Sequence, residues 1–334
     1  MIRVGIIGWG ENGKKIANAL HFQIKDVEVI GIATENKEGR DYAINKMGLK
    51  HVFNNHSSLL ELHQIDIICV CSDGDLHLNH IEKSLSSGSN VFIDHPLASN
   101  VEDCKKLEKI IDSYPSYKTT VAFPRRFDHR IEPAKRDIKE GKLGNILRID
   151  CHTYESIPQR RSENEFPKVT KGIFMDLMLQ DIDMVRWLTE AEYESVYVSG
   201  NAHKYPSLKR QNDADTAIAI AKLTGNILVN FISSRVTHRG SGYELKVVGT
   251  NGEINIRQLD MSNKLVDSLD GKPFYLSTGA KENDYLRLLK DYVAAVRNGN
   301  RINYKLEDGT EATRVAVAMT KSFILGQEVS LKSE

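Results

Sequence analysis

The 334-residue chain has no excess of charge of either sign: Lys and Arg together number 45, and Asp and Glu also number 45. A balanced chain generates no global field that would recruit nucleic acid or an acidic membrane surface. Long apolar runs are lacking too, since none approaches the roughly 18 residues that a membrane span needs. The first residues have the pattern of a core strand and not that of a signal peptide, so we expect a soluble, cytoplasmic protein.

Cysteine is scarce, with four residues in the whole chain, which is too few for a disulfide framework in a protein of this length. Cys69 and Cys71 lie two positions apart in an apolar run, so we expect both to be core thiols on one face of a strand. His63, His80 and Cys104 do not have the spacing of metal ligands, and the sequence therefore predicts no metal site.

The most informative stretch is the first twenty residues, MIRVGIIGWGENGKKIANAL. An apolar run at residues 4–7 predicts a strand, and a helical pattern follows three glycines spaced as G-x-G-x-x-G. In such a turn Gly8 permits the tight bend, Gly10 lets the backbone approach a pyrophosphate, and Gly13 lets helix and strand pack closely. Free N–H groups at the helix N-terminus then bind the phosphates. The sequence therefore predicts dinucleotide binding.

Short apolar runs alternate with helical patterns through the first 122 residues. The expected further strands are residues 27–33, 65–71, 91–93 and 119–123. Near-continuous apolar runs are typical of parallel strands buried on both faces, and the alternation predicts a doubly wound parallel sheet. Ligands of such sheets lie beyond the carboxyl ends of the strands. Residues 72–77 and 94–96 should therefore face the cofactor.

The end of the second expected strand selects the cofactor in a dinucleotide-binding fold. An acidic residue there hydrogen-bonds the ribose hydroxyls of NAD, and Glu35 can do so. Thr34, with Lys37 and Arg40, would instead favour the extra phosphate of NADP, although a solvated loop explains both cations equally well. Because a carboxylate repels a 2′-phosphate, we expect a modest preference for NAD, with NADP as the alternative.

After residue 122 the expected strands become longer and follow one another directly. The expected elements are strands at 227–234 and 243–248, a hairpin turn at Asn251-Gly252, and helices at about 174–188, 284–299 and 307–326. We therefore expect two domains. Residues 1–122 form an α/β Rossmann domain, and residues 123–334 form an α+β domain with a mostly antiparallel sheet. The helix at about 307–326 can pack back on the Rossmann domain.

These landmarks together resemble the Gfo/Idh/MocA family of oxidoreductases over essentially the whole chain. The matching segments are SDGDLH at 72–77 (family T-P-x-x-x-H), VFIDHPLA at 91–98 (V-x-x-E-K-P-L-A), RRF at 125–127 (R-R-F), EGKLG at 140–144 (E-G-x-I-G) and DLMLQDIDMVRWL at 176–188 (D-x-G-x-H-x-x-D-x-x-R-W-L). The resemblance implies a Rossmann domain followed by an open-faced sheet. It also implies NAD or NADP as the cofactor and, usually, hydride transfer on sugars or cyclitols.

The chain departs from this family at the catalytic positions. The family's catalytic lysine corresponds to His95 and its catalytic histidine to Gln180, while the family's aspartate is retained as Asp176. An imidazole transfers protons near neutral pH, whereas a glutamine can only hydrogen-bond. We therefore predict that His95 transfers the proton, that Asp176 orients it or balances its charge, and that Gln180 binds a hydroxyl. The alternative for His95 is to fill the space of the lost lysine.

Two sets of binding residues follow from the motifs and the resemblance. The cofactor set is Gly8, Trp9, Gly10, Glu11, Asn12, Gly13, Thr34, Glu35, Ser72, Asp73, His77, Asp94, His95 and Arg126. The substrate set is His95, Arg126, Tyr154, Arg160, Arg161, Lys171, Asp176 and Gln180. The cations of the second set, together with Lys168, favour an anionic substrate such as a phosphate or carboxylate. Glu163 and Glu165 in the same stretch leave an ordinary solvated loop as the alternative.

The sequence thus predicts an NAD(P)-dependent oxidoreductase that acts on a small molecule: a sugar, a cyclitol or a derivative. Two other functions stay open, namely a non-catalytic dinucleotide-binding or regulatory protein, and a lyase or hydrolase that uses bound NAD transiently. Neither nucleic acid nor a membrane is expected as a partner. We expect a homodimer or homotetramer formed through the open face of the sheet, because large exposed apolar patches mark interfaces. Ile218, Ile220, Phe231 and Leu245 can contribute apolar area to one side of the sheet or the other, and the alternative is that they face the core.

Overall fold

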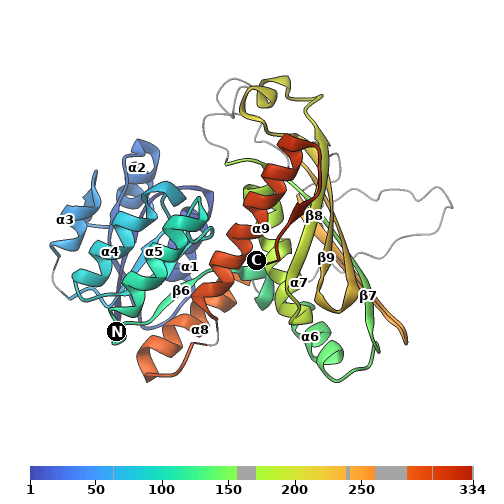
Figure 1. Cartoon of the computed structure of the whole chain (residues 1–334). Coiled ribbons are helices and arrows are strands. Elements are labelled where there is room, and N and C mark those ends of the chain that lie inside the picture. Colours follow the sequence, from blue (N-terminus) through green and yellow to red (C-terminus); the bar gives the residue numbers. More distant parts are fainter. Residues whose placement is uncertain (63, 156–170, 238–240, 260–283, 303, 333–334) are drawn as a thin grey trace, which may run out of the picture. The chain divides into compact units, whose positions relative to one another are not determined.

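The computed structural model describes the whole chain except residues 63, 156–170, 238–240, 260–283, 303 and 333–334. Two compact units make up the chain (Figure 1): Met1–Asp128 with Glu282–Thr313, and His129–Lys281 with Arg314–Glu334. The sequence predicts a division after residue 122, with everything beyond it in the second domain. In the structure the first unit extends to Asp128, and Glu282–Thr313 returns to it.

The first unit is built on a six-stranded parallel sheet with the strand order β3-β2-β1-β4-β5-β6. Its strands are β1 (Ile2–Ile7), β2 (Val27–Ala33), β3 (His51–Phe53), β4 (Ile67–Val70), β5 (Asn90–Ile93) and β6 (Thr119–Val121). Every residue of β4 is buried, as expected of a central strand covered on both faces. The predicted doubly wound parallel sheet is therefore confirmed.

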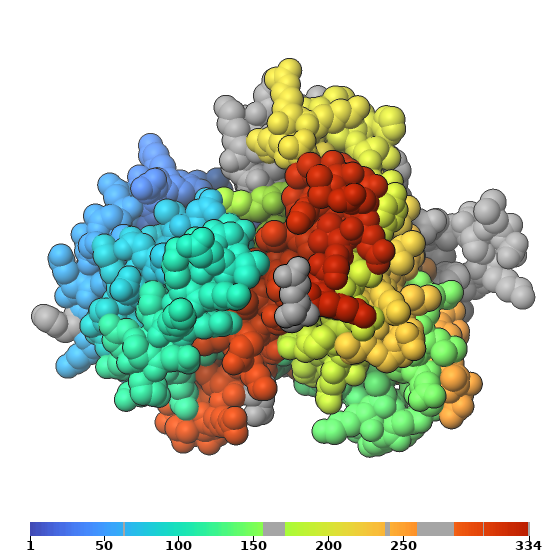
Figure 2. Space-filling view, viewed as in Figure 1, coloured from blue at the N-terminus to red at the C-terminus, as the bar shows by residue number. Residues whose placement is uncertain are grey.

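The crossover helices of this unit follow the strands in the order that the alternation predicted. They are α1 (Glu11–Phe22), α2 (Lys37–Asn45), α3 (His56–Leu60), α4 (His77–Ser86) and α5 (Val101–Asp112), with short 3₁₀ turns η1 (Gly74–Leu76) and η2 (Pro124–Phe127). Helices α4 and α5 pack side by side, and their outer surfaces are visible in cyan and teal in Figure 2.

A helix from far along the chain completes the core of this unit. Helix α8 (Asp284–Asn298) packs against α1, where Ile16 and Leu20 share one buried cluster with Leu289 and Tyr292. Helix α9 (Leu306–Leu325) begins in the first unit and ends in the second. No helix of the described residues is long and apolar enough to cross a bilayer.

The second unit is built on a seven-stranded sheet with the order β12-β11-β7-β10-β9-β8-β13. Its strands are β7 (Ile146–Tyr154), β8 (Tyr193–Asn201), β9 (Thr216–Leu223), β10 (Ile227–Ser234), β11 (Gly242–Gly249), β12 (Glu253–Leu259) and β13 (Val329–Ser330). All neighbours are antiparallel except β7 and β10. This arrangement confirms the predicted mostly antiparallel sheet, and Asn251-Gly252 does form the β11–β12 hairpin turn.

Helices and turns of the second unit connect these strands. They are α6 (Ile131–Lys139), the π-helix η4 (Phe174–Met178), α7 (Leu179–Thr189), and the 3₁₀ turns η5 (Pro206–Gln211) and η6 (Thr224–Asn226). Along β9 the burial alternates, with Ala217, Ala219 and Ala221 buried and the residues between them exposed or partly exposed. One face of the sheet is therefore packed and the other is open, as an antiparallel sheet allows.

Candidate active site

The turn after β1 has the geometry that a bound pyrophosphate needs. Gly8 adopts a φ of +99°, and a Cβ atom there would lie 2.5 Å from the Cys71 carbonyl group. A Cβ atom on Gly13 would lie 3.1 Å from the Gly8 carbonyl oxygen. Around Gly10, by contrast, nothing lies within 4 Å of where a Cβ would stand. Gly10 is also the N-cap of α1, so no capping side chain competes with a phosphate for the first N–H groups. These residues fit a dinucleotide.

We expect Gly10→Ala to separate folding from cofactor binding. Gly10 has φ −86° and ψ −171°, a conformation that alanine adopts, and the added methyl meets open space. The free energy of unfolding should therefore change by no more than about 0.5 kcal/mol. The added methyl group would lie where the pyrophosphate approaches. Overpacking costs about 1–3 kcal/mol and would weaken NAD binding roughly 5- to 150-fold.

Calorimetric titration with NAD measures this effect. Gly252→Ala is the matched control, because Gly252 lies in the β11–β12 turn and a Cβ atom there also meets open space. An unchanged affinity in Gly10→Ala would show that the pyrophosphate does not bind at this turn.

Beyond β5, three side chains form a buried hydrogen-bonded cluster. Oδ1 of Asp94 lies 3.2 Å from Nδ1 of His95, and these side chains are 10% and 7% exposed. The hydroxyl of Tyr285, on α8, donates to the same Oδ1 at 2.9 Å and lies 3.4 Å from the His95 Nδ1. Asp94 and His95 were expected at this edge from the sequence, whereas Tyr285 was not, because no local motif marks it.

The Asp94 carboxylate is ionised although it is buried. Burial by itself would raise the pKa of Asp94, but the charge and hydrogen bond of His95, with hydrogen bonds from Tyr285 and Asn12, lower it below its ordinary value. Asn12 belongs to α1, so the cluster joins the glycine turn to the end of β5. An ionised Asp94 holds the Nδ1 side of His95 in place, as a carboxylate does for a general base.

His77, a predicted cofactor ligand, joins two loops of the first unit. It is fully buried, with Nδ1 3.0 Å from the Leu97 carbonyl oxygen and Nε2 2.9 Å from that of Ser72. Burial lowers the pKa of His77, against the opposing effect of these carbonyls. The Ser72 hydroxyl lies 2.8 Å from Nδ1 of His80, whose pKa burial lowers to about 4. We read His77 as a structural tie between the segments that follow β4 and β5.

Arg126 is engaged within the first unit as well. Its guanidinium lies 3.0 Å from an oxygen of Asp308, and it stacks over the Phe123 ring at 5.5 Å. The Arg126 side chain is only 4% exposed. The sequence predicts that this arginine binds the cofactor and an anionic substrate, and in the structure its charge is balanced by Asp308 in the first turn of α9.

In the second unit, Asp176 lies in the π-helix η4 that leads into α7. Such short π-helical insertions are frequent at functional sites. The Asp176 carboxylate accepts a hydrogen bond from the Arg235 guanidinium at 3.0 Å and one from the Lys171 N–H at 3.2 Å. The same guanidinium lies 3.5 Å from a carboxylate oxygen of Asp213. The retained aspartate of the family is thus part of an ion-pair cluster.

Asp213 and Arg235 are nearly buried, with side chains 3% and 5% exposed. Asp213 accepts hydrogen bonds from the N–H groups of Ile173 at 2.7 Å and Ala214 at 2.8 Å, which tie it to the start of the Asp176 helix. Burial raises the pKa of Asp213, and Arg235 and the two N–H groups oppose that rise. Neither residue was predicted as part of a site, because their contacts join segments far apart in sequence.

Three more predicted substrate ligands lie in the described part of this unit. Gln180 is half-buried in the first turn of α7, Lys171 is exposed, and Tyr154 ends β7 with its hydroxyl 3.3 Å from Nδ1 of His152. Arg160 and Arg161, with Lys168, lie outside the described residues. No group of three or more His, Cys, Asp or Glu side chains suited to a metal ion occurs among the residues that the structure describes.

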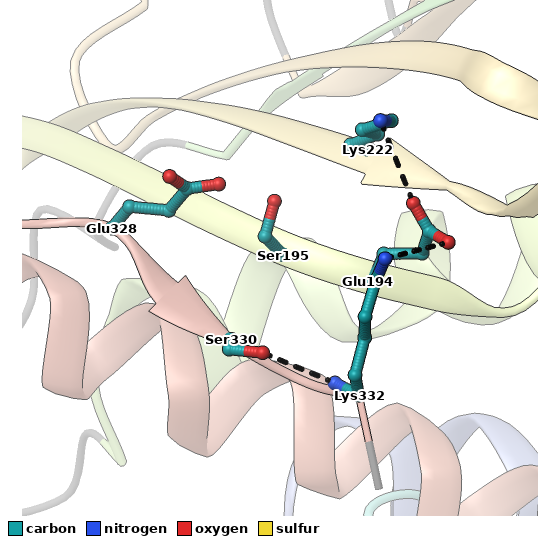
Figure 3. A pocket seen from close by; sticks show the side chains of 6 residues that line it. All are labelled: Glu194, Ser195, Lys222, Glu328, Ser330 and Lys332. Carbon is teal, nitrogen blue, oxygen red and sulfur yellow. Dashed lines mark hydrogen bonds and ion pairs between the residues drawn. The ribbon is translucent and has the colours of Figure 1, made fainter.

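A surface pocket of about 330 Å³ lies at the β8–β13 edge of the second unit and contains none of the predicted site residues. Figure 3 shows its lining side chains: Glu194, Ser195, Lys222, Glu328, Ser330 and Lys332. Glu194 pairs with Lys332 at 3.3 Å and with Lys222 at 3.8 Å. The charges of the lysines and glutamates that line this pocket compensate one another, and we assign the pocket no chemistry.

Comparison with known proteins decides the family. Residues 2–119 match the oxidoreductase family described as having an NAD-binding Rossmann fold, and residues 135–331 match the C-terminal alpha/beta domain of the same family, Gfo/Idh/MocA. The chain belongs to this family. The resemblance that the motifs indicated is therefore confirmed, and residues 2–119 of the first unit are its NAD-binding domain.

Several proteins similar to this chain are named as inositol dehydrogenases. The myo-inositol 2-dehydrogenase of Thermotoga maritima is 26% identical, with 100% of this chain and 99% of the relative covered. The scyllo-inositol 2-dehydrogenase (NAD(+)) of Bacillus subtilis is also 26% identical, with 99% and 96% covered. A solved structure of the scyllo-inositol dehydrogenase of Lactobacillus casei, with bound NAD(H) and scyllo-inositol, has a TM-score of 0.90 and 25% identity over 100% of both chains.

Proposed function

We propose that this NAD-dependent oxidoreductase interconverts a secondary alcohol and a ketone on a cyclitol or sugar, with His95 transferring the hydroxyl proton. The chemistry that NAD supplies when bound is acceptance or return of the hydride. The inositol dehydrogenases that resemble the chain over its whole length support the substrate class. The observation that carries the proposal is the Asp94–His95 contact of 3.2 Å in a buried setting.

Each residue of the cluster has a role in this proposal. Asp94 orients the imidazole through Nδ1, so we assign the proton transfer to Nε2, as base in oxidation and acid in reduction. Tyr285 holds Asp94 by its hydrogen bond. Asp176 and Gln180 of the second unit are proposed to bind hydroxyl groups of the substrate, because both present acceptor oxygens and Gln180 is also a donor.

Nicotinamide absorbance tests this function directly. The full-length protein, mixed with NAD and a panel of inositols and other polyols, should reduce NAD with at least one cyclitol. If the protein binds NAD but does not reduce it with any polyol of the panel, the result would favour the non-catalytic, dinucleotide-binding alternative. A cofactor that stays bound and does not exchange would favour the lyase or hydrolase.

We also propose that the substrate carries an anionic group. One support is Lys171, whose side chain is exposed and whose backbone N–H donates a hydrogen bond to Asp176. The other is the cationic sequence of residues 159–161. A ligand that binds the native state raises thermal stability. In the presence of NAD, inositol phosphates should therefore raise the melting temperature more than neutral inositols. The difference should vanish in Arg160→Ala, Arg161→Ala. Stabilisation by neutral inositols alone would refute the anionic substrate.

Assembly through the open face of the second-unit sheet is the remaining proposal. Ile218, Ile220, Tyr197 and Leu228 are 44–54% exposed and share that face in the strand register, whereas Phe231 and Leu245 are buried on the other. A contiguous exposed apolar patch of this kind marks an interface.

Light scattering should therefore show a dimer or tetramer that dissociates in Ile218→Lys, Ile220→Lys. The control Ile324→Lys changes an equally exposed isoleucine on α9 and should leave the assembly intact. A monomeric wild type would contradict the proposal.

A further inference from the structure

The segment after β2 forms the end of a Rossmann cofactor site that receives the adenosine ribose. β2 ends at Ala33, and Thr34 is the first residue beyond the strand. Thr34 is 7% exposed, its N–H donates to the Phe53 carbonyl at 2.9 Å, and its hydroxyl oxygen accepts from the Asn36 N–H at 3.1 Å. The side chain fixed at this position is therefore a neutral hydroxyl group.

The neighbouring acid, Glu35, is exposed. No hydrogen bond or ion pair within the described part of the chain holds its carboxylate. A carboxylate that selects NAD must be ordered against the ribose hydroxyls, and ordering a flexible side chain costs conformational entropy. Glu35 thus selects against a 2′-phosphate more weakly than a carboxylate fixed at position 34 would.

A guanidinium group is fixed at the same place. Nη1 of Arg40, on α2, donates to the Thr34 carbonyl oxygen at 2.9 Å. This bond uses one of the five N–H donors of the guanidinium, and the planar fork matches phosphate oxygens in pairs. Lys37, the exposed first residue of α2, adds a second cation on the same turn of helix.

Helix α2 is also held against the glycine turn. A Cβ atom on Gly39 would overlap the Trp9 indole, so α2 and the turn are in close contact. The Trp9 ring lies 5.4 Å from the ring of Tyr42, and Asn36 caps the helix by accepting from the Gly39 N–H at 3.2 Å. Arg40 is therefore placed relative to the pyrophosphate turn before any cofactor binds, which lowers the cost of ordering it.

We propose that this end of the site accepts a ribose 2′-phosphate, with Arg40 as its principal ligand, and that the protein binds NADP at least as tightly as NAD. This replaces the modest preference for NAD that Glu35 alone suggested. It rests on the NAD-binding domain and not on turnover of a cyclitol, so binding measured without substrate tests it separately from the proposed function.

Calorimetric titration of the full-length protein with NAD⁺, NADP⁺, 5′-AMP and 2′,5′-ADP measures the contribution of the phosphate. NADP⁺ should bind with a dissociation constant no higher than that of NAD⁺. Because hydrogen bonds to charged groups are strong, 2′,5′-ADP should bind about tenfold more tightly than 5′-AMP. If NADP⁺ binds about tenfold or more weakly than NAD⁺, the proposal is wrong.

Variants identify the residues responsible. In Arg40→Ala the ratio of NADP⁺ to NAD⁺ affinity should fall about tenfold, and in Thr34→Asp it should fall by at least as much, because a fixed carboxylate repels the phosphate. Lys46→Ala, which removes an exposed cation from the other end of α2, is the matched control and should leave the ratio unchanged. An equal loss of both affinities in Arg40→Ala, with an unaltered ratio in Thr34→Asp, would overturn the assignment.

Discussion

His95→Ala is expected to lower turnover by roughly 10²–10⁴-fold, the range for a positioned general acid or base. Cofactor affinity should change far less, since the glycine turn and its helix remain. The physical reason is that Asp94 and Tyr285 fix one side of the imidazole in a buried cluster, so that alanine removes the proton acceptor without a substitute. Steady-state turnover with the cyclitol found in the absorbance screen, and separate titration with NAD, provide the two measurements.

The pH dependence distinguishes His95 from its partner. Because the pKa of Asp94 is lowered below its ordinary value of 3.8, its carboxylate stays charged through the neutral range. A fall in kcat/KM on the acid side of neutrality therefore does not report protonation of Asp94. His95→Lys, which restores the residue type of the family, should move the optimum to higher pH, because the ordinary pKa of lysine is about 10.4.

Tyr285→Phe is the companion variant. It removes one hydrogen bond to Asp94 and keeps the aromatic ring in the core, so a loss well below that of His95→Ala is expected. If His95→Ala retains turnover within about threefold of the wild type, the assignment is wrong. Asp176→Asn is then the next variant to measure.

The second large effect is expected from Arg235→Ala, which should lower the free energy of unfolding by about 3–5 kcal/mol. Arg235 lies between Asp176 and Asp213, and its removal takes away the cation that lies 3.5 Å from the buried Asp213 carboxylate. An uncompensated buried charge is costly because the protein interior does not replace its hydration. Urea unfolding followed by circular dichroism measures the change.

Two controls separate charge burial from lost packing. Asp213→Asn in the Arg235→Ala background should recover part of the loss, and Arg210→Ala, an exposed arginine of the same unit, should change stability by no more than about 0.5 kcal/mol. Because burial raises the pKa of Asp213, the penalty in Arg235→Ala should shrink as the pH falls and the carboxyl takes up a proton. A destabilisation that is independent of pH and of Asp213 would instead indicate packing alone.

Local patterns predicted much of this protein. The glycine turn could be predicted because its motif, Gly8 to Gly13, lies within one short segment, although the close packing at Gly8 and Gly13 also involves Cys71. The helices expected at about 284–299 and 307–326 are α8 and α9, since an apolar stripe with helical period is present within each segment alone. Asp94 and His95 were predicted at the sheet edge because the carboxyl ends of parallel strands meet there.

The sequence by itself determined the two sheets, the dinucleotide turn and the family, because strand and helix periods and backbone sterics act within a few residues. Only the tertiary structure decided which groups complete each cluster. Tyr285 reaches Asp94 across 191 residues and Arg235 reaches Asp176 across 59. Such contacts depend on where α8 and the end of β10 pack. A hydrogen bond between two distant side chains produces no periodic pattern in the sequence. For the same reason Arg126, a family motif residue, acquired its partner Asp308 only in the folded chain.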